Sequence, residues 1–478
     1  MTTPIQFGDE PQSNDVRRIV TSREPHALRT FTPTQAVLAK SAGSFHWTPE
    51  GRRLYDYTSG VLVANLGHNP RRWMERFSGY LGWKAENLFG DGGSDDFFAA
   101  CGLTAYNALT EIEALAVERL IGNVQSFPGG ERLDTVMWAA SGSEAIQKAL
   151  WACLHYDESR DLIAATRYGF HGKKGLAGAV TGCEQDADRD SRVKFVSFPM
   201  QEVDDIANYG RDIDLSTYQA ELDALWNEHG RRLNCLITEP YLGGGGSYHP
   251  PKSYLQLLGN FCRAHDILFI LDEVQANFGR TGCMYAFEKY GVAPDFVCLG
   301  KGLGNGIPVS AAVGRGDVMA SLDYGEASDT WSANPLSCAA VLATLDEFES
   351  TDVLEHAGKI SKLFFEGLAR LKQTGVISKV RGEGMVFGIE CAAAGGLSPQ
   401  EVANAVVEAC YLGAATADSK PAPTGIHLLG PLAGTVLRVS PPMTLTEQQA
   451  DSSLELLYDI CHQLGQRLES GKLAMKTL

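Results

Sequence analysis

Short β-rich runs alternate with helical stretches through the middle of the chain, and this alternation constrains the fold more than any other feature. The runs are "TVMWAA", "DLIAAT", "VKFVSF", "LNCLITEP", "ILFILDE", "FVCLG" and "SAAVGR". Strands that alternate with helices form βαβ units, in which parallel strands share one sheet and helices cover both of its faces. The sequence therefore predicts an α/β fold whose large domain has a mainly parallel sheet.

The chain of 478 residues is long enough for more than one domain. We expect residues 1–69 to form a polar arm and a hairpin that belong to a small domain. Residues 70–340 should form the large domain, and residues 341–478 a smaller α+β domain. The segment "SKPAPTG" near 419–425 is typical of a loop.

Composition excludes some classes of function. The formal charge of −17, from 58 acidic and 41 basic side chains, argues against a nucleic-acid partner, which requires clustered Lys and Arg. Eleven cysteines are scattered without a C-x-x-C pair, so no metal site is expected. No run approaches the roughly 18 apolar residues of a membrane span, and the N-terminus lacks a secretory apolar segment. We expect a cytoplasmic protein without a membrane partner.

The buried run "LFILDEVQ" ends on two adjacent carboxylates, Asp272 and Glu273. Two interpretations are open: a solvated strand end, or a ligand site at the carboxyl edge of a parallel sheet, where such folds bind ligands. Because successive side chains of a strand alternate, Glu273 should point away from Asp272.

A strand, a Ser-Gly-Ser turn and a helix follow one another in "TVMWAASGSEAIQKALWACLHY". Backbone N–H groups at a helix start, with hydroxyls and a close glycine, form an anion site. The alternative is an ordinary N-cap. Neither a Walker A nor a dinucleotide glycine pattern occurs, so a nucleotide phosphate is not indicated.

Lys301 follows a buried strand in "CLGKGLGNGIP". Most lysines lie on solvated faces, but a desolvated lysine has a lowered pKa and becomes a nucleophile that forms Schiff bases. An amine, a phosphate cradle and a carboxylate for a ring nitrogen are together what pyridoxal phosphate requires. This combination favours Asp272 as the partner of the pyridine nitrogen.

The sequence resembles the class III aminotransferases, pyridoxal-phosphate enzymes of fold type I, from "RLYDYTSG" to "LRVSPP". The matching segments are "SGSEA", "FHG", "ITEP", "LDEVQANFGRTG", "LGKGLGNGIP", "TWSANPLSCAA", "VRGEGMVFGIE" and "LRVSPPM". Each motif is weak alone, but eight in order are specific. The resemblance implies catalytic roles for Lys301 and Asp272 and a set of cofactor-binding residues, namely Ser141, Gly142, Ser143, Phe170, Glu239, Asp272, Val274, Gln275, Lys301 and Thr330.

Within this set the resemblance also implies individual roles. The Ser-Gly-Ser turn would hold the phosphate, while Phe170 and Val274 would pack against the two faces of the ring. Gln275 would reach the phenolic oxygen, and Glu239 would lie near Asp272. Lys301 would form the Schiff base and then move the proton. The alternative for Phe170 is a plain core residue, and we interpret His171 and Arg280 as scaffold residues.

The resemblance implies that Arg438 binds a substrate carboxylate. The alternative is that Arg438 only stabilises the end of a strand. Thr330 would reach the phosphate of a neighbouring subunit, so a homodimer is expected. Two positions depart from the family pattern: Ala140 replaces an asparagine, and Gly244 replaces the glutamate of members acting on ornithine or 4-aminobutyrate. Val61 replaces the glutamine of dialkylglycine decarboxylases and is expected to line an apolar substrate pocket.

We therefore predict an aminotransferase that moves an amino group from an amine or amino acid to a 2-oxo acid. The donor could carry an ω-amino group or an apolar tail. One alternative is a decarboxylase or aminomutase on the same cofactor, such as a dialkylglycine decarboxylase. Another is a catalytically silent relative that binds the cofactor or a partner protein. The presence of both Lys301 and Asp272 argues against the silent relative.

Overall fold

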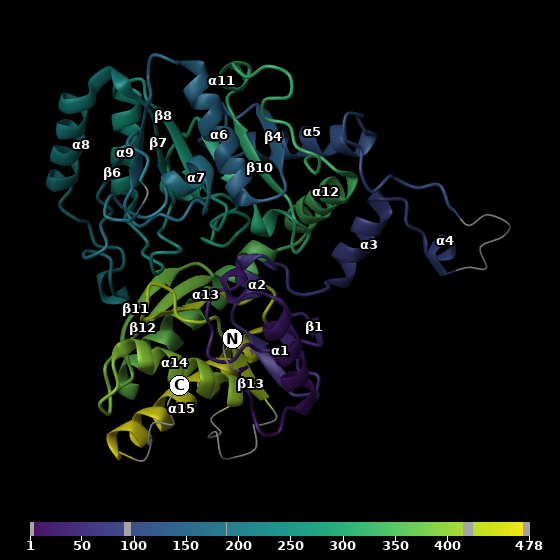
Figure 1. The fold of residues 1–478 in the computed structure, drawn as a ribbon, viewed down its shortest axis with the longest axis vertical. Helices are drawn as coiled ribbons and strands as arrows, with labels where there is room; N and C mark the ends of the chain where they lie inside the picture. Colours follow the sequence, from purple (N-terminus) through teal and green to yellow (C-terminus); the bar gives the residue numbers. More distant parts are fainter. Residues whose placement is uncertain (1–3, 90–96, 188, 414–423, 472–478) are drawn as a thin grey trace.

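The computed structural model describes residues 4–89, 97–187, 189–413 and 424–471. They form two lobes, and both ends of the chain lie in the lower lobe of Figure 1. The upper lobe contains the larger sheet with helices on both sides. Among these residues, no helix combines the length and the apolar character that crossing a bilayer requires.

A seven-stranded sheet forms the centre of the upper lobe, in the order β4-β10-β9-β8-β7-β5-β6. Strand β10 runs antiparallel to both of its neighbours, β4 and β9, and the remaining pairs of the sheet are parallel. All the predicted β-rich runs form its strands, so the predicted α/β fold is confirmed. Their bounds are β4 Thr135–Ala139, β5 Leu162–Thr166, β6 Val193–Val196, β7 Leu233–Thr238, β8 Leu268–Asp272, β9 Phe296–Leu299 and β10 Ser310–Gly314.

The sheet is buried on both faces, as parallel sheets require. In β8, Ile270 packs in the apolar cluster formed with α6, whereas Phe269 and Leu271 belong to the main core on the other face. Since side chains alternate along a strand, Asp272 continues the row of Ile270 and Glu273 continues the row of Leu271. The burial pattern thus fixes which carboxylate faces the α6 side of the sheet.

Most helices of the upper lobe pack on these two faces, whereas α4 lies apart from the sheet in Figure 1. Helix α6 contacts α7 and the central strands, while α12 packs against α3 and α5. The bounds are α3 Arg71–Tyr80, α4 Ala85–Phe89, α5 Glu111–Gln125, α6 Gly142–Tyr156, α7 Gly175–Ala179, α8 Ser216–His229, α9 Lys252–Ala264, α10 Ala286–Tyr290, α11 Gly316–Met319 and α12 Pro335–Ser350.

The lower lobe contains two small sheets, with the orders β1-β2-β3-β13 and β11-β12-β14. Strands β2 and β3 form the predicted hairpin, and β13 adds to β3 in parallel, so early and late segments share one sheet. The bounds are β1 Lys40–Ala42, β2 Phe45–Trp47, β3 Arg53–Asp56, β11 Ile377–Glu383, β12 Val386–Cys391, β13 Thr424–His427, β14 Val436–Val439, α1 Pro11–Arg23, α2 Ser59–Leu62, α13 Val353–Arg370, α14 Pro399–Leu412 and α15 Glu447–Glu469. Short 3-10 turns lie at His26–Leu28 and Leu371–Thr374 in this lobe, and at Ile206–Asn208, Gly230–Arg232 and Lys301–Leu303 in the segments that connect the large sheet.

Two segments differ from the sequence interpretation. The predicted loop near 419–425 lies mostly outside the described residues, but Thr424 and Gly425 begin strand β13. The polar arm contains helix α1, which its sequence did not indicate. This helix buries Arg17 rather than an apolar stripe, and the guanidinium pairs with Glu10 at 2.8 Å and with the Tyr411 hydroxyl at 3.0 Å.

Candidate active site

A cavity of about 360 Å³ opens at the carboxyl edge of the large sheet, beyond the ends of β4, β7, β8 and β9. It brings together nine of the predicted residues, which come from five separate segments: Ser141, Gly142, Ser143, Phe170, Glu239, Asp272, Val274, Gln275 and Lys301. Other lining residues were not assigned to the site from sequence, namely Val63, Ala140, His171 and residues 306–310, although Ala140 and His171 were expected beside it. The sequence segments "FHG" and "GNGIPVS" contain most of these residues and could have been used to predict them.

Asp272 is buried at the end of β8, where its two oxygens have separate partners. Oδ2 lies 2.7 Å from His171 Nδ1, and Oδ1 accepts the Val274 N–H at 3.0 Å. These bonds fix the carboxylate at the cavity wall. His171, interpreted from sequence as a scaffold residue, therefore lines the cavity and positions Asp272 directly.

Glu273 points to the opposite face, as the alternation of the strand requires. Its two oxygens accept the backbone N–H groups of Ala286 at 2.6 Å and Phe287 at 2.7 Å, at the start of α10. Burial raises the pKa of Glu273 to about 8. This carboxyl group therefore accepts hydrogen bonds at the N-terminus of α10 and does not line the cavity.

Glu239 lies at the end of β7 and is also buried. It accepts the Phe170 N–H at 2.9 Å and the Gly243 N–H at 3.2 Å, so it fixes two loops of the cavity. Burial raises the pKa of Glu239 to about 7, and the nearby charge of Asp272 adds to this rise against the opposing effect of His171.

Lys301 follows β9 and has a left-handed backbone, with a φ of 47°. The left-handed region is uncommon for a side chain larger than glycine, and such residues concentrate at functional sites. Burial lowers the pKa of Lys301 to about 8, although the charge of Asp272 favours the protonated form. At pH 7 roughly a tenth of this amine is therefore neutral and nucleophilic, far more than for a lysine with an ordinary pKa.

The start of α6 forms one end of the cavity. Ser141 is the N-cap, and Glu144 completes a capping box by accepting the N–H groups of Ala140 at 2.9 Å and Ser141 at 3.0 Å. A side chain at Gly142 would place its Cβ 2.8 Å from the Val274 Cγ1. Only glycine allows this close packing between the helix start and the loop after β8.

The glycine-rich segment after β7 packs against two other lining residues. A Cβ at Gly243 would lie 2.2 Å from the Gln275 Oε1, and one at Gly244 would lie 2.8 Å from the Phe170 Cβ. The space that a glutamate would need at position 244 is thus occupied by Phe170. Within the described part of the chain, the buried Gln275 Oε1 has no hydrogen-bond partner.

Arg438 lies in β14 and is buried near the cavity without being one of the described residues that line it. Its Nη2 donates to the Gly243 carbonyl at 2.9 Å. Its buried Nε finds no acceptor among residues 4–89, 97–187, 189–413 and 424–471. Burial lowers the pKa of this guanidinium, whose charge also acts on Lys301.

Two predicted residues lie apart from the cavity of this chain, as far as the structure describes it. Val61 is 42% exposed on the segment that brings Val63 to the cavity wall. Thr330 is exposed in the loop before α12, next to Trp331, which is 62% exposed. This loop is anchored through Asp329, which binds Lys148 at 2.7 Å.

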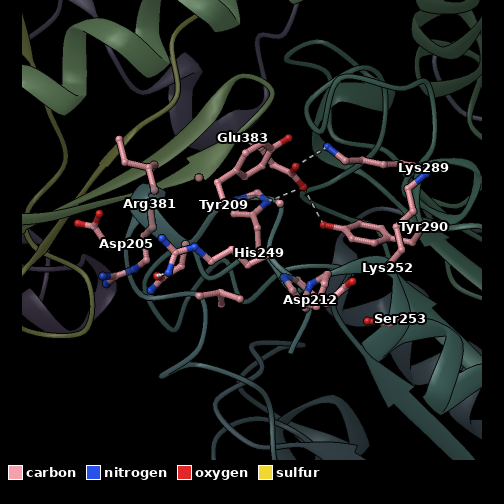
Figure 2. A pocket seen from close by; sticks show the side chains of 18 residues that line it. Asp205, Tyr209, Asp212, His249, Lys252, Ser253, Lys289, Tyr290, Arg381 and Glu383 are labelled. Atoms are coloured by element: carbon pink, nitrogen blue, oxygen red, sulfur yellow. Dashed lines mark hydrogen bonds and ion pairs between the residues drawn. The ribbon is translucent and has the colours of Figure 1, made fainter. Parts of the chain in front are cut away.

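A second cavity, of about 350 Å³, lies between the lobes and is shown in Figure 2. Its central carboxylate, Glu383, binds Lys289 at 2.9 Å, the Tyr290 hydroxyl at 2.9 Å and His249 at 3.3 Å. The amine of Lys289 also donates to the Thr281 carbonyl at 2.6 Å. Lys289 of this cavity is thus engaged by a carboxylate and a carbonyl.

Comparisons with known proteins agree with this geometry. The family model described as "Aminotransferase class-III" matches residues 97–461. An acetylornithine aminotransferase of Caldanaerobacter subterraneus subsp. tengcongensis is 28% identical over 452 residues, which cover 93% of this chain and all of that protein. An omega-aminotransferase of Caulobacter vibrioides is 28% identical over 461 residues, covering 91% of this chain and 95% of that one.

A solved ornithine aminotransferase from Toxoplasma gondii ME49 has the same fold, with a TM-score of 0.76, 20% identity and coverage of 96% of this chain and 97% of that one. These matches confirm the predicted family, fold and cofactor. The chain belongs to the class III aminotransferase family and is a transaminase that depends on pyridoxal phosphate.

Proposed function

We propose that this enzyme transfers an amino group from an amine or amino acid with an apolar tail to a 2-oxo acid, and that Lys301 carries both the cofactor and the proton. One observation carries the proposal. Lys301, with its lowered pKa, shares a single cavity with the fixed Asp272 carboxylate and the start of α6.

The residues of the cavity fit pyridoxal phosphate. The amine of Lys301 suits its aldehyde, and Asp272, oriented by His171, suits the protonated ring nitrogen. The N–H groups and hydroxyls at the start of α6 suit the phosphate. Among the described residues the buried Gln275 Oε1 has no hydrogen-bond donor, and a hydroxyl group of the bound cofactor would supply one. Phe170 and Val274 supply apolar surface for the ring.

The bound cofactor supplies an electron sink for the carbanion at the amino-bearing carbon of the donor. The residues of this chain do the remaining tasks. Asp272 would keep the ring nitrogen protonated, and the Lys301 Nζ would take the proton from the amino-bearing carbon of the donor and hold it for return. A pKa near 8 suits this amine for both steps near neutral pH.

The walls of the cavity support a donor with an apolar tail. Val63, Phe170 and Ile307 contribute apolar side chains. Gly244, packed against Phe170, leaves Arg438 without a glutamate partner at that position, so its guanidinium is available for a carboxylate. We propose that Arg438 binds the carboxylate of the 2-oxo acid. We also propose that Val61, which is exposed two residues before Val63, contacts the part of the donor tail that extends beyond the cavity.

We also propose a homodimer, in which Thr330 of the partner subunit reaches the phosphate. The exposed aromatic side chain of Trp331 beside Thr330 supports an interface at this loop. A cytoplasmic location is part of the same proposal. It is supported by the eleven cysteines, which are all free thiols.

A half-reaction tests the proposed function. The holoenzyme is mixed with single amino donors, without a 2-oxo acid, and the visible absorption of the cofactor is followed. We expect bleaching to the pyridoxamine form with apolar amines or amino acids and a much slower change with ornithine and 4-aminobutyrate. Carbon dioxide release from a disubstituted amino acid with an unbleached cofactor would instead indicate the decarboxylase.

A further inference from the structure

A cluster of three histidines surrounds a buried aspartate in the lower lobe, outside the active-site cavity. His46 comes from β2, Asp56 from the end of β3, His68 from the segment after α2, and His427 from the end of β13. His46, Asp56 and His68 each offer one atom that could bind a metal ion, and these three atoms lie within 4.8 Å of one another. His46 is 3% exposed and Asp56 is fully buried.

The two oxygens of Asp56 have different surroundings. Oδ1 accepts the Thr58 N–H and the Thr58 hydroxyl, both at 2.7 Å, and the Ser59 N–H at 3.1 Å. Oδ2 faces the imidazoles, 2.7 Å from His68 Nε2 and 3.4 Å from His46 Nε2. The backbone bonds to Oδ1 thus hold Oδ2 in a fixed position toward the two rings.

Two imidazole nitrogens of the cluster are buried and make no well-aligned hydrogen bond with a described residue, namely His46 Nε2 and His427 Nδ1. His46 Nε2 has only its longer contact of 3.4 Å to the Asp56 Oδ2. The other nitrogen of His46, Nδ1, lies 2.7 Å from the Ser41 hydroxyl, so its ring orientation is fixed. The His427 ring lies 5.5 Å from the His46 ring between centroids. Buried polar atoms without partners call for an explanation.

We propose that His46, His68 and Asp56 bind a divalent transition-metal ion of the zinc class, with His427 or a water molecule beside it as the fourth ligand. Imidazole and carboxylate ligands bind zinc at about 2.0–2.2 Å in a tetrahedron, whose edges are then about 3.3 Å long. The distance of 3.4 Å between His46 Nε2 and Asp56 Oδ2 matches such an edge.

The other edge, between His68 Nε2 and Asp56 Oδ2, is 2.7 Å long in the hydrogen-bonded state. Metal binding would remove the shared proton and lengthen this edge by roughly 0.6 Å. Ser41 on His46 and the backbone N–H groups on Asp56 already provide the outer hydrogen bonds that orient metal ligands.

The cluster also anchors a strained segment that leads to the active site. Ser59, Gly60, Val61 and Leu62 have consecutive positive φ angles of 48°, 59°, 68° and 62°. For a β-branched residue such as Val61 this conformation is an outlier. The segment begins at the N–H groups that Asp56 accepts and ends beside Val63 in the cavity wall. A metal ion would therefore stabilise the lower lobe and this segment together.

Metal binding by the holoenzyme tests the proposal. The enzyme is freed of metal with a chelator, dialysed against Zn²⁺, and its metal content is measured. We expect about one ion per chain in the wild type and a higher melting temperature with Zn²⁺ than without it. His46→Gln should lose the ion, and Ser41→Ala should weaken binding by about 10-fold. His26→Gln, on an exposed histidine, is the matched control and should bind as the wild type does.

Cobalt provides a second readout that does not depend on a folded variant. Wild-type enzyme loaded with Co²⁺ should show visible d–d bands of a nitrogen and oxygen site without thiolate charge transfer. A thiolate band would place the ion on a cysteine and overturn the proposal. Absence of stoichiometric binding by the wild type, or equal loss in His46→Gln and His26→Gln, would also overturn it.

Discussion

The His171 Nδ1 lies 2.7 Å from the Asp272 Oδ2 at the carboxyl edge of the sheet. This contact joins the loop after β5 to the end of β8 and fixes the orientation of the carboxylate. The His171 Nε2 is buried and makes no hydrogen bond with any residue that the structure describes. A fixed anion at this position can hold a positive charge on a ring nitrogen, which is the role that we propose for Asp272.

Replacing Asp272 should impair chemistry, whereas replacing its neighbour should impair stability. Asp272→Asn keeps the shape of the side chain but removes its charge, and we expect kcat to fall by about 100-fold to 1000-fold. Glu273→Gln should leave kcat unchanged but lower the free energy of unfolding by about 1–3 kcal/mol, because one N–H of α10 loses its acceptor. Steady-state kinetics and denaturant unfolding measure the two effects. Equal losses of kcat in both variants would contradict the assignment.

The lowered pKa of Lys301 predicts how cofactor capture depends on pH. Only the neutral amine attacks the aldehyde, so the rate at which apoenzyme captures pyridoxal phosphate should rise through pH 8 and then level off. Rapid-mixing absorbance measures this rate, and Lys301→Ala, which should capture none, is the control. If the rate instead kept rising up to pH 10.5, the ordinary pKa of a lysine, the amine would not have a lowered pKa and the prediction would be wrong.

Because Gly142 packs closely against Val274, a larger residue at position 142 should lower the affinity for the cofactor. Gly142→Ala should displace the start of α6 and weaken cofactor binding by about 5-fold to 150-fold, since overpacking costs about 1–3 kcal/mol. Val274→Ala in the same chain should restore part of the affinity. Gly122→Ala is the matched control. It lies in α5 with no described atom within 4 Å of the new Cβ, and it should be neutral or slightly stabilising.

The proposed homodimer predicts complementation between two defective variants. Each active site would use Lys301 of one subunit and Thr330 of the other, so Lys301→Ala and Thr330→Arg should each be inactive alone. Co-expression should restore about a quarter of the wild-type activity, because half of the dimers are mixed and each has one intact site. If mixed dimers form, as mass spectrometry would show, yet remain inactive, Thr330 does not act across the interface.

The fold could be predicted from sequence because the strands are buried on both faces and read as short apolar runs. Helix α1 could not, because it is held by the buried pair of Arg17 and Glu10 instead of an apolar stripe. The motifs predicted the lining residues that follow strand ends, such as Asp272 and Lys301. Sequence spacing could not show that His171 binds Asp272, 101 residues away, or that Val63 and not Val61 reaches the cavity wall.

The position of the bound cofactor tests the central claim most directly. Borohydride reduction of the holoenzyme, followed by proteolysis and mass spectrometry, identifies the amine to which the cofactor is attached. We expect a single modified peptide with the cofactor on Lys301. Modification of Lys289, in the cavity of Figure 2, or of any other lysine would contradict it.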